Sequence, residues 1–463
     1  MKRHFFIAAT LIIASACSES LQEAADITPS LGNTHTIELS PEELSLVERI
    51  ANNTPKINQE SAQASAMNLL GLEGEASTHQ MMSAVFCNQK KVFNSLTKSY
   101  NTTDDTAFYL FNMPDKNGFA IIAADLRVPN QVLAYSDNGN FDTDTDKPGM
   151  QLFLELAKDY VAQCIAIADA QEDSLTESIC QKLGIEADTS QHGLRTKSKI
   201  LQKIKCTMVG YPTETIENIG SVRPMLNTLF GQEEPYNQKS GVQKAGCAPI
   251  AVSQLLAYWH YPAVIDGVIM DWDVINKGIN NDYYANQVAT LVNFVRKGLG
   301  TDGSSTKSHK VIKFFQQIRC SSQNQYYDYK YYKVIDALKE GKPVFMRGDG
   351  NNKNHAWIVD GYLERRIIKE EVFKYCIVEQ SDDGTITAHE EDIPSRTSTM
   401  YKLLHINWGW YGRANGYYNQ GVFDTDRAMI EGNNGYFRET TAILNDRHYY
   451  KNVEIITDIK PRY

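Results

Sequence analysis

Cysteine and histidine are the residues of this chain whose types and surroundings could support covalent catalysis. Cys247 follows Gly246 and precedes the apolar run 248–259, which indicates a helix buried inside a domain. Because proline is tolerated only in the first turn of a helix, Pro249 requires this helix to begin near Cys247. Free N–H groups and partial positive charge at a helix N-terminus favour the thiolate, the nucleophilic form of cysteine. Cys247 is therefore a candidate nucleophile, and an inert core cysteine at a helix start is the alternative.

A cysteine nucleophile needs a base, normally a histidine that the fold brings close to it. His355 follows a turn rich in glycine and asparagine and opens the apolar run 355–361, which predicts a buried strand. Residues 334–346 predict a helix and a strand just before that turn. His260 lies at the far end of the cysteine helix, about four turns from Cys247, which is too far to serve it. His355 is thus the candidate base, and a loop histidine bound to backbone groups is the alternative.

A base histidine also needs a group that orients it. The residues His-Ile-Asn-Trp-Gly-Trp-Tyr-Gly at 405–412 predict a short strand that enters an aromatic, glycine-rich loop. Asn407 fits the orienting role, and Trp408 could shield its hydrogen bond from water. In a regular strand His405 lies on the same side as Asn407, so it stays open as a second candidate base.

The order of these motifs is more informative than any one of them. Gln232, whose amide could help to form an oxyanion hole, precedes the Gly-Cys helix that ends in Tyr-Trp-His-Tyr-Pro. The motifs His-Ala-x-x-Val-Asp-Gly and His-x-Asn-Trp-Gly-Trp-x-Gly follow. Over about residues 222–440 this arrangement resembles the streptopain family of papain-like cysteine peptidases. Residues 40–170 are similar to the propeptide of that family, notably at 118–125 and 133–137.

This resemblance implies an α+β fold with a papain-like catalytic domain, in which the buried cysteine helix packs on an antiparallel sheet, and an α+β propeptide domain before it. It implies that Cys247 attacks the scissile carbonyl to form a thioester and that His355 acts as base and acid. Gln232 would donate to the oxyanion, Asn407 would orient His355, and Trp408 would cover the bond between them. The family needs no metal or organic cofactor, acts on proteins or peptides, and is inhibited by its own propeptide.

Changes in composition along the chain predict the domain organisation. A helix should begin at Ser40-Pro41, where Glu43 completes a capping box, and strands should follow between residues 107 and 141. An amphipathic helix is expected over about 150–170. We therefore predict a signal peptide (1–16), a tether (17–39), an inhibitory propeptide domain (40–200), a cleavable linker (201–221) and a peptidase domain (222–463).

The N-terminus carries the pattern of a secretion signal. A positively charged head at residues 2–4 precedes an apolar run, 5–14, that is too short to span a bilayer. The small residues at 14–16 stand before Cys17 as in a bacterial lipobox, which predicts lipidation of Cys17. Ordinary signal-peptide cleavage nearby is the alternative. The expected location is the envelope of a bacterium, with membrane contact only through this anchor and with the catalytic domain released after cleavage unless the two halves stay associated.

Other features narrow the class of function. The formal net charge of −10, with no basic run, gives no reason to expect nucleic-acid binding. The eight cysteines lack a C-x-x-C pair, so no zinc site is indicated. No serine-hydrolase, zincin or nucleotide-binding motif is present. Two alternatives remain: a non-catalytic binding protein on a peptidase fold, and a transglutaminase-like acyl transferase, which would usually want an aspartate partner for its histidine.

The sequence also departs from the family pattern. Phe230 stands where tryptophan is frequent, and Asn354 stands where glycine is frequent. Arg347 and Asp349 add charge near the candidate base. Residues 363–400 separate the two strands expected to carry His355 and Asn407, and their polar composition predicts an extended surface hairpin or flap.

Overall fold

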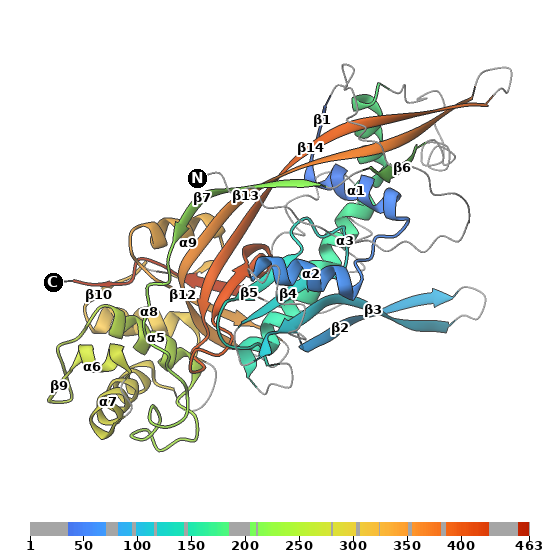
Figure 1. Cartoon of the computed structure of the whole chain (residues 1–463). Helices are drawn as coiled ribbons and strands as arrows, with labels where there is room; N and C mark the ends of the chain where they lie inside the picture. Colours follow the sequence, from blue (N-terminus) through green and yellow to red (C-terminus); the bar gives the residue numbers. More distant parts are fainter. Residues whose placement is uncertain are drawn as a thin grey trace. The chain divides into compact units, whose positions relative to one another are not determined.

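The structure is a computed structural model of the chain (Figure 1). It describes residues 36–70, 82–94, 99–114, 118–142, 147–184, 204–209, 212–278, 281–301, 306–323, 325–350, 354–380, 386–425 and 452–462. The predicted signal peptide and Cys17 lie outside these residues. None of the helices among them is both long and apolar enough to cross a bilayer.

The chain divides into two compact units. Unit 1 comprises the residues up to 57 together with 167–217 and 366–400, and unit 2 comprises 58–166, 218–365 and 401–463. The long elements that pass between the units are α3 (Pro148–Lys182), β7 (Thr213–Val222), β13 (His355–Gln380) and β14 (Ile386–Asn407). Each unit therefore combines segments that are far apart in the sequence.

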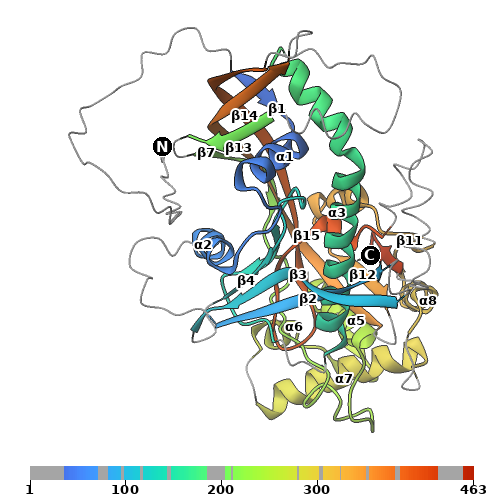
Figure 2. The same ribbon diagram turned by 90° about the vertical axis from the view of Figure 1, so that its right-hand side faces the viewer.

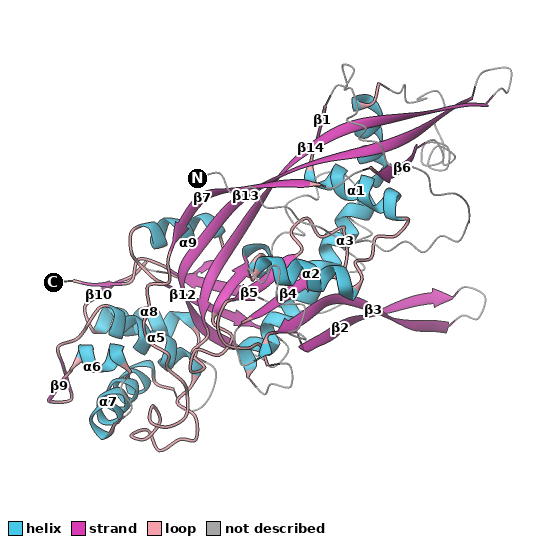
Figure 3. Ribbon diagram, viewed as in Figure 1, coloured by secondary structure: helices cyan, strands magenta, loops and turns pink. Residues whose placement is uncertain are grey.

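Unit 2 contains the helices that carry and surround the candidate nucleophile. Figure 3 shows several of them gathered together beside the strands. They are α2 (Gln59–Leu69), α5 (Cys247–Tyr258), α6 (Trp272–Lys277), α7 (Asp282–Leu299), α8 (Ser308–Gln317), α9 (Tyr331–Lys339) and the 3₁₀ turn η3 (Gln420–Phe423). Capping fixes their ends as in α7, where the Asn281 side chain accepts from the Tyr284 N–H and Gly300 ends the helix at φ +58°.

Most strands of unit 2 belong to one sheet. Within that sheet the order is β11-β16-β12-β13-β14-β15-β5-β4-β3-β2. Figure 2 shows β2, β3 and β4 side by side. Besides β13 and β14, the strands of unit 2 are β2 (Met82–Asn94), β3 (Ser99–Asn112), β4 (Phe119–Ala123), β5 (Val132–Ser136), β8 (Val264–Ile265), β9 (Val268–Ile269), β10 (Cys320–Ser321), β11 (Tyr327–Asp328), β12 (Val344–Asp349), β15 (Gly416–Asn419), β16 (Asn452–Ile456) and β17 (Lys460–Pro461).

The sheet joins the predicted propeptide to the predicted peptidase. The strand β5 pairs antiparallel with β15, with Tyr135 opposite Tyr417 and Ala134 opposite Tyr418. The pairs β12–β13 and β14–β15 are antiparallel as well. This arrangement confirms the predicted α+β class, with the cysteine helix on an antiparallel sheet.

The strand β13 separates two hydrophobic cores, because its side chains alternate between the faces of the sheet. Ala356 and Ile358 belong to the core that contains α5, α7 and α8. Trp357 and Val359 belong to a second core, which they share with propeptide side chains such as Phe153. By the same alternation His355 lies on the Trp357 face, and its ring stacks near the Trp357 ring with centroids 6.1 Å apart.

Unit 1 is built around the far ends of β13 and β14, which Figure 1 shows as two long neighbouring strands. Its other elements are β1 (Ile37–Leu39), α1 (Pro41–Asn52) and β6 (Ile204–Met208). The predicted capping box of α1 is confirmed, since the Ser40 side chain accepts from the Glu43 N–H and the Glu43 side chain accepts from the Ser40 N–H. The helix predicted over 150–170 is longer than expected and ends at Lys182.

The segment predicted to be a cleavable linker is largely strand where the structure describes it. Residues 204–208 form β6, which pairs antiparallel with β13 at 373–377, and residues 213–222 form β7 on the same partner. Backbone groups held in a sheet are poor substrates for proteolysis. Residues 185–203 lie outside the described part of the chain.

Candidate active site

Cys247 is the first residue of α5, which is buried over residues 248–257. Gly246 precedes it at φ +98°, a backbone conformation that disfavours any side chain, so the sharp entry into the helix needs glycine. The thiol is half-buried, and burial raises its pKa. The N–H groups of Ala356 and Ala248 and the charge of Arg347 oppose that rise. The nucleophile therefore lies beside the first residues of β13.

Gln232 lies next to this helix start. Its backbone carbonyl accepts from the Ala245 N–H at 2.7 Å, two residues before Cys247. The Arg296 guanidinium donates to the Ala245 carbonyl at 2.7 Å and holds the same turn. Gln232 is buried. This placement agrees with a donor near the oxyanion position, and that role stays a prediction.

His355 is 1% exposed, and its imidazole makes one hydrogen bond among the described residues. The Nε2 atom lies 2.9 Å from the Trp408 carbonyl. Because a carbonyl only accepts, Nε2 must carry the proton, and Nδ1 is then the basic nitrogen. Nδ1 is buried without a partner. Burial lowers the pKa of His355 to about 4, against the opposing effect of the Trp408 carbonyl.

Gly149, the second residue of α3, packs directly against the imidazole. A Cβ atom there would lie 2.8 Å from Nε2 of His355 and 2.9 Å from Cε3 of Trp408, closer than real side-chain contacts allow. Only a glycine lets the helix approach so closely. The propeptide segment therefore helps to hold the His355 side chain in its present position.

The contacts of Asn407 differ from the prediction. Its amide nitrogen donates to the Thr228 carbonyl at 2.8 Å, and its amide oxygen accepts from the Gly409 N–H at 3.1 Å. The expected Asn407–His355 bond is thus absent from the described contacts, because His355 instead donates to the next carbonyl, that of Trp408. The Trp408 ring lies near the His355 ring, with centroids 6.0 Å apart, and its role as a shield stays a prediction.

A second histidine in this region has a strong partner that the sequence did not assign. Nδ1 of His405 lies 2.6 Å from Oδ1 of Asp360, which is fully buried. The other carboxylate oxygen of Asp360 accepts from the Leu226 N–H at 2.9 Å. Among the described contacts the aspartate-paired histidine is therefore His405 and not His355. Asp360 belongs to the Val-Asp-Gly motif of β13. Its odd spacing from His355 places the two side chains on opposite faces of the strand, and this spacing is the sequence signal that could have separated their roles.

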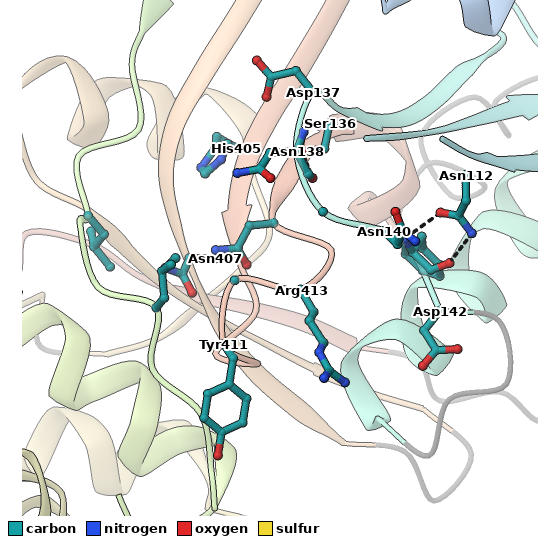
Figure 4. Close-up of a pocket in the computed structure, with 16 residues that line it drawn as sticks. Asn112, Ser136, Asp137, Asn138, Asn140, Asp142, His405, Asn407, Tyr411 and Arg413 are labelled. Atoms are coloured by element: carbon teal, nitrogen blue, oxygen red, sulfur yellow. Dashed lines mark hydrogen bonds between the residues drawn. The ribbon is translucent and has the colours of Figure 1, made fainter. Parts of the chain in front are cut away.

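A cavity of about 830 Å³ adjoins Asn407 (Figure 4). Propeptide residues 136–142 form one wall, and Asn112 fixes this loop through paired hydrogen bonds with the Phe141 backbone at 2.8 and 2.9 Å. The opposite wall comes from the predicted peptidase and includes His405 and Arg413. Residues of the propeptide thus occupy one side of the space next to the candidate site.

The departures from the family pattern have simple structural roles. Arg347 donates to the Asp349 carboxylate at 2.6 Å and lies 3.6 Å from Glu454, so its charge is balanced. Phe230 is fully buried and packs against Tyr236 with ring centroids 5.0 Å apart, as a larger aromatic residue could. The described parts of residues 363–400 belong to the neighbouring strands β13 and β14, which agrees with the predicted hairpin.

Comparisons with known proteins agree with this arrangement. The profile of the Spi protease inhibitor family matches residues 54–161, and the profile of the Peptidase C10 family matches residues 270–418. The second match includes His355, Asn407 and Trp408, whereas Cys247 precedes it. The chain is also similar to the thiol protease/hemagglutinin PrtT of Porphyromonas gingivalis, with 21% identity over 402 residues. That alignment covers 74% of this chain and 39% of the relative.

An inhibitor-type segment thus packs, through Gly149, on a histidine of a peptidase-type segment, and the two share one sheet and one hydrophobic core. The chain therefore contains a domain that matches the peptidase C10 (streptopain) family, preceded by a propeptide domain that matches the Spi protease inhibitor family.

Proposed function

We propose that this chain is the inactive precursor of a cysteine endopeptidase, with Cys247 as nucleophile and His355 as base and acid. The proposal rests on the contact between α5 and β13. Cys247 is the first residue of the buried helix α5, and its thiol lies against the N–H of Ala356, the residue after His355. A thiol at a helix N-terminus beside a histidine-bearing strand is the arrangement that nucleophilic catalysis by cysteine requires.

In the proposed reaction the Cys247 thiolate attacks the carbonyl carbon of the scissile peptide bond. The N–H of Cys247 and the amide of Gln232 donate to the oxygen that becomes negatively charged. Protonated His355 gives its proton to the leaving nitrogen as the C–N bond breaks, which leaves a thioester on Cys247. His355 then takes a proton from water, the water oxygen attacks the thioester, and the C–S bond breaks to release the acid.

The described geometry supports an inactive state of this machinery. Burial raises the pKa of the Cys247 thiol and lowers the pKa of His355, so both groups favour their neutral forms. The basic Nδ1 of His355 has no partner, while Gly149 blocks the ring on the Nε2 side. We infer that departure of the propeptide lets His355 pair with Cys247 through Nδ1 and with Asn407 through Nε2–H.

Export and anchoring are part of the same proposal. The charged head, the short apolar run and the small residues before Cys17 support secretion from a bacterium and lipidation of Cys17. The anchor would then belong to the propeptide rather than to the peptidase domain.

Replacement of the nucleophile tests the proposed reaction. The Cys247→Ala precursor should fold, remain uncleaved and show no hydrolysis of casein after its linker is cut by an added protease. Cys320→Ala is a suitable control, because Cys320 is another free cysteine in the same core. Casein hydrolysis by the Cys247→Ala protein at the rate of the control would refute Cys247 as the nucleophile, whereas an inactive control protein would favour a non-catalytic binding protein.

A further inference from the structure

The hairpin extension, which we define as residues 366–400 of β13 and β14, presents an apolar face within unit 1. Phe373 and Tyr375 are fully buried there, and Ile393 is nearly so. These residues lie in the insertion between the strands that carry His355 and Asn407. The hairpin extension therefore stays covalently attached to the peptidase domain after any cut in the linker.

Both ends of the propeptide cover this apolar face. Its N-terminal end contributes buried residues from β1 and α1, and its C-terminal end contributes residues near the end of α3. These residues are Ile37, Leu39, Leu44, Leu46, Val47, Ile179 and Cys180, and they form one core with Phe373, Tyr375 and Ile393. The match to the inhibitor family, 54–161, lies between these two ends in the sequence.

Backbone pairing between β1 and β14 also joins the propeptide to the hairpin extension. The strand β1 runs parallel to β14, with Ile37 opposite Ser395 and Leu39 opposite Thr397. Ile37 and Leu39 are buried, whereas Glu38 between them is exposed. The propeptide thus adds a strand to the hairpin extension, and alternate side chains of that strand enter its core.

A half-buried ion pair joins the hairpin extension to α1. The Lys369 ammonium of the hairpin extension lies 3.0 Å from Glu48 of α1 and 3.3 Å from Glu371 of β13. Burial raises the pKa of Glu371, and Lys369 opposes that rise. Loss of α1 would leave Lys369 with one fewer partner, so this pair favours the docked state.

The two propeptide ends also bind each other. The Lys182 ammonium donates to the Glu38 carbonyl at 2.7 Å, and Ser178 donates to the Glu43 carboxylate at 2.6 Å. Arg49 of α1 lies 3.2 Å from Glu172 of α3. The ends therefore meet the hairpin extension as one body.

We propose that the hairpin extension is a docking surface for the two ends of this chain's own propeptide, and that it retains the propeptide after the linker is cut. This inference rests on the proposed function, since it adds a second step to activation. A cut between residues 184 and 204 leaves residues 36–184 as one fragment, which binds the peptidase fragment both through the shared sheet of unit 2 and through the hairpin extension. Two linked contacts raise the effective concentration of each, so release is slower than from either alone.

The test uses the Cys247→Ala precursor, in which the chain's own activity plays no part. A recognition sequence for a site-specific protease is inserted between residues 184 and 204, and the purified protein is cut to completion. We expect the two fragments to elute together in gel filtration. The propeptide fragment is then labelled with a fluorophore, and the complex is diluted into an excess of unlabelled propeptide fragment. The rate at which the labelled fragment dissociates is the release rate.

Variants of β1 separate retention by the hairpin extension from retention by unit 2. Ile37→Lys/Leu39→Lys places charges in the apolar core, and we expect release to become at least about tenfold faster, since one of the two linked contacts is lost. Glu38→Lys removes the exposed ion pair of Glu38 with Arg396, 3.8 Å apart, and leaves the buried side chains of the strand unchanged, so it should change the rate less than about twofold. Circular dichroism of the uncut variants checks that each remains folded.

Two outcomes would overturn the proposal. In one, the fragments of the cut protein with unchanged β1 elute separately; in the other, the double variant and Glu38→Lys release the propeptide at the same rate. Neither readout depends on peptide hydrolysis. If the peptidase proves inactive, the proposed function is refuted, but the result of this binding test still holds.

Discussion

At the scale of single residues, the imidazole of His355 shows how the precursor stays inactive. Its Nε2–H donates to the Trp408 carbonyl, and its Nδ1 has no hydrogen-bond partner among the residues that the structure describes. This tautomer already suits a base that acts through Nδ1, so activation needs a change of position and not of tautomer. The side of the ring that would have to move lies against Gly149 of the propeptide.

Gly149→Ala should loosen the inactive state. The added methyl group would overlap His355 and Trp408, so α3 must move away from the imidazole. We expect iodoacetamide to alkylate Cys247 in the uncut precursor about three to ten times faster, because the cost of overpacking favours opening of the site. Mass spectrometry of the labelled peptide provides the measurement. Gln163→Ala, on the same helix about 20 Å further along, is the control. Equal alkylation of the two variants would show that Gly149 does not restrain the site.

At the scale of elements, the pair β13–β14 organises the molecule. His355 begins β13 and Asn407 ends β14, so both candidate residues lie at one end of the pair. The hairpin extension continues from the other end. Asp360 links the two strands to the segment before α5, through its hydrogen bonds with His405 and with the Leu226 N–H.

Asp360→Asn should weaken this link. The asparagine amide is uncharged and offers only one acceptor oxygen, so it binds the Leu226 N–H and Nδ1 of His405 together only if His405 carries its proton on Nε2, and the charge of the carboxylate is lost in either case. We expect the free energy of unfolding of the Cys247→Ala precursor to fall by about 1.5–3 kcal/mol, measured by urea denaturation, since hydrogen bonds to the buried Asp360 carboxylate are weakened. Asp336→Asn, at an exposed position on α9, should have little effect. If both variants unfold at the same urea concentration, Asp360 does not hold these strands together.

At the scale of the whole molecule, the propeptide is part of the hydrophobic core of each unit. In unit 2 it shares a core with Trp357 and Trp408, and in unit 1 it shares one with Phe373 and Tyr375. Retention of the propeptide, as proposed, would connect any N-terminal anchor to the peptidase domain after the linker is cut.

The anchor can be tested in a bacterial host. Radiolabelled palmitate should enter the precursor, and Cys17→Ser should abolish the label and move the protein to the soluble fraction. Cys164→Ser controls for loss of an unrelated cysteine, because Cys164 is buried in α3. If propeptide is retained as proposed, the cut peptidase fragment should also sediment with membranes. Label in the Cys17→Ser protein would show that the lipobox interpretation is wrong.

Several helix and strand starts around the candidate site could be predicted from the sequence, because caps, glycine, proline and apolar runs define them locally. The helix start at Cys247 was predictable from Gly246 and Pro249, and the capping box of α1 from Ser40 and Glu43. The strand that begins at His355 was predictable from its apolar run. In each case the pattern is set by neighbours along the chain, through helix geometry or the alternation of a strand.

The tertiary structure decided what depends on contacts between distant segments. The approach of Gly149 to His355, the bond of Asn407 to Thr228 and the pairing of Asp360 with His405 join residues between 45 and 206 positions apart, and no local pattern encodes them. The same holds for residues 363–400, whose polar composition predicted a surface hairpin but not the core it forms with both propeptide ends. The sequence by itself determined which residues could perform the chemistry. The packing of the propeptide against β13 and β14 determined where the imidazole of His355 lies, between Gly149 and the Trp408 carbonyl.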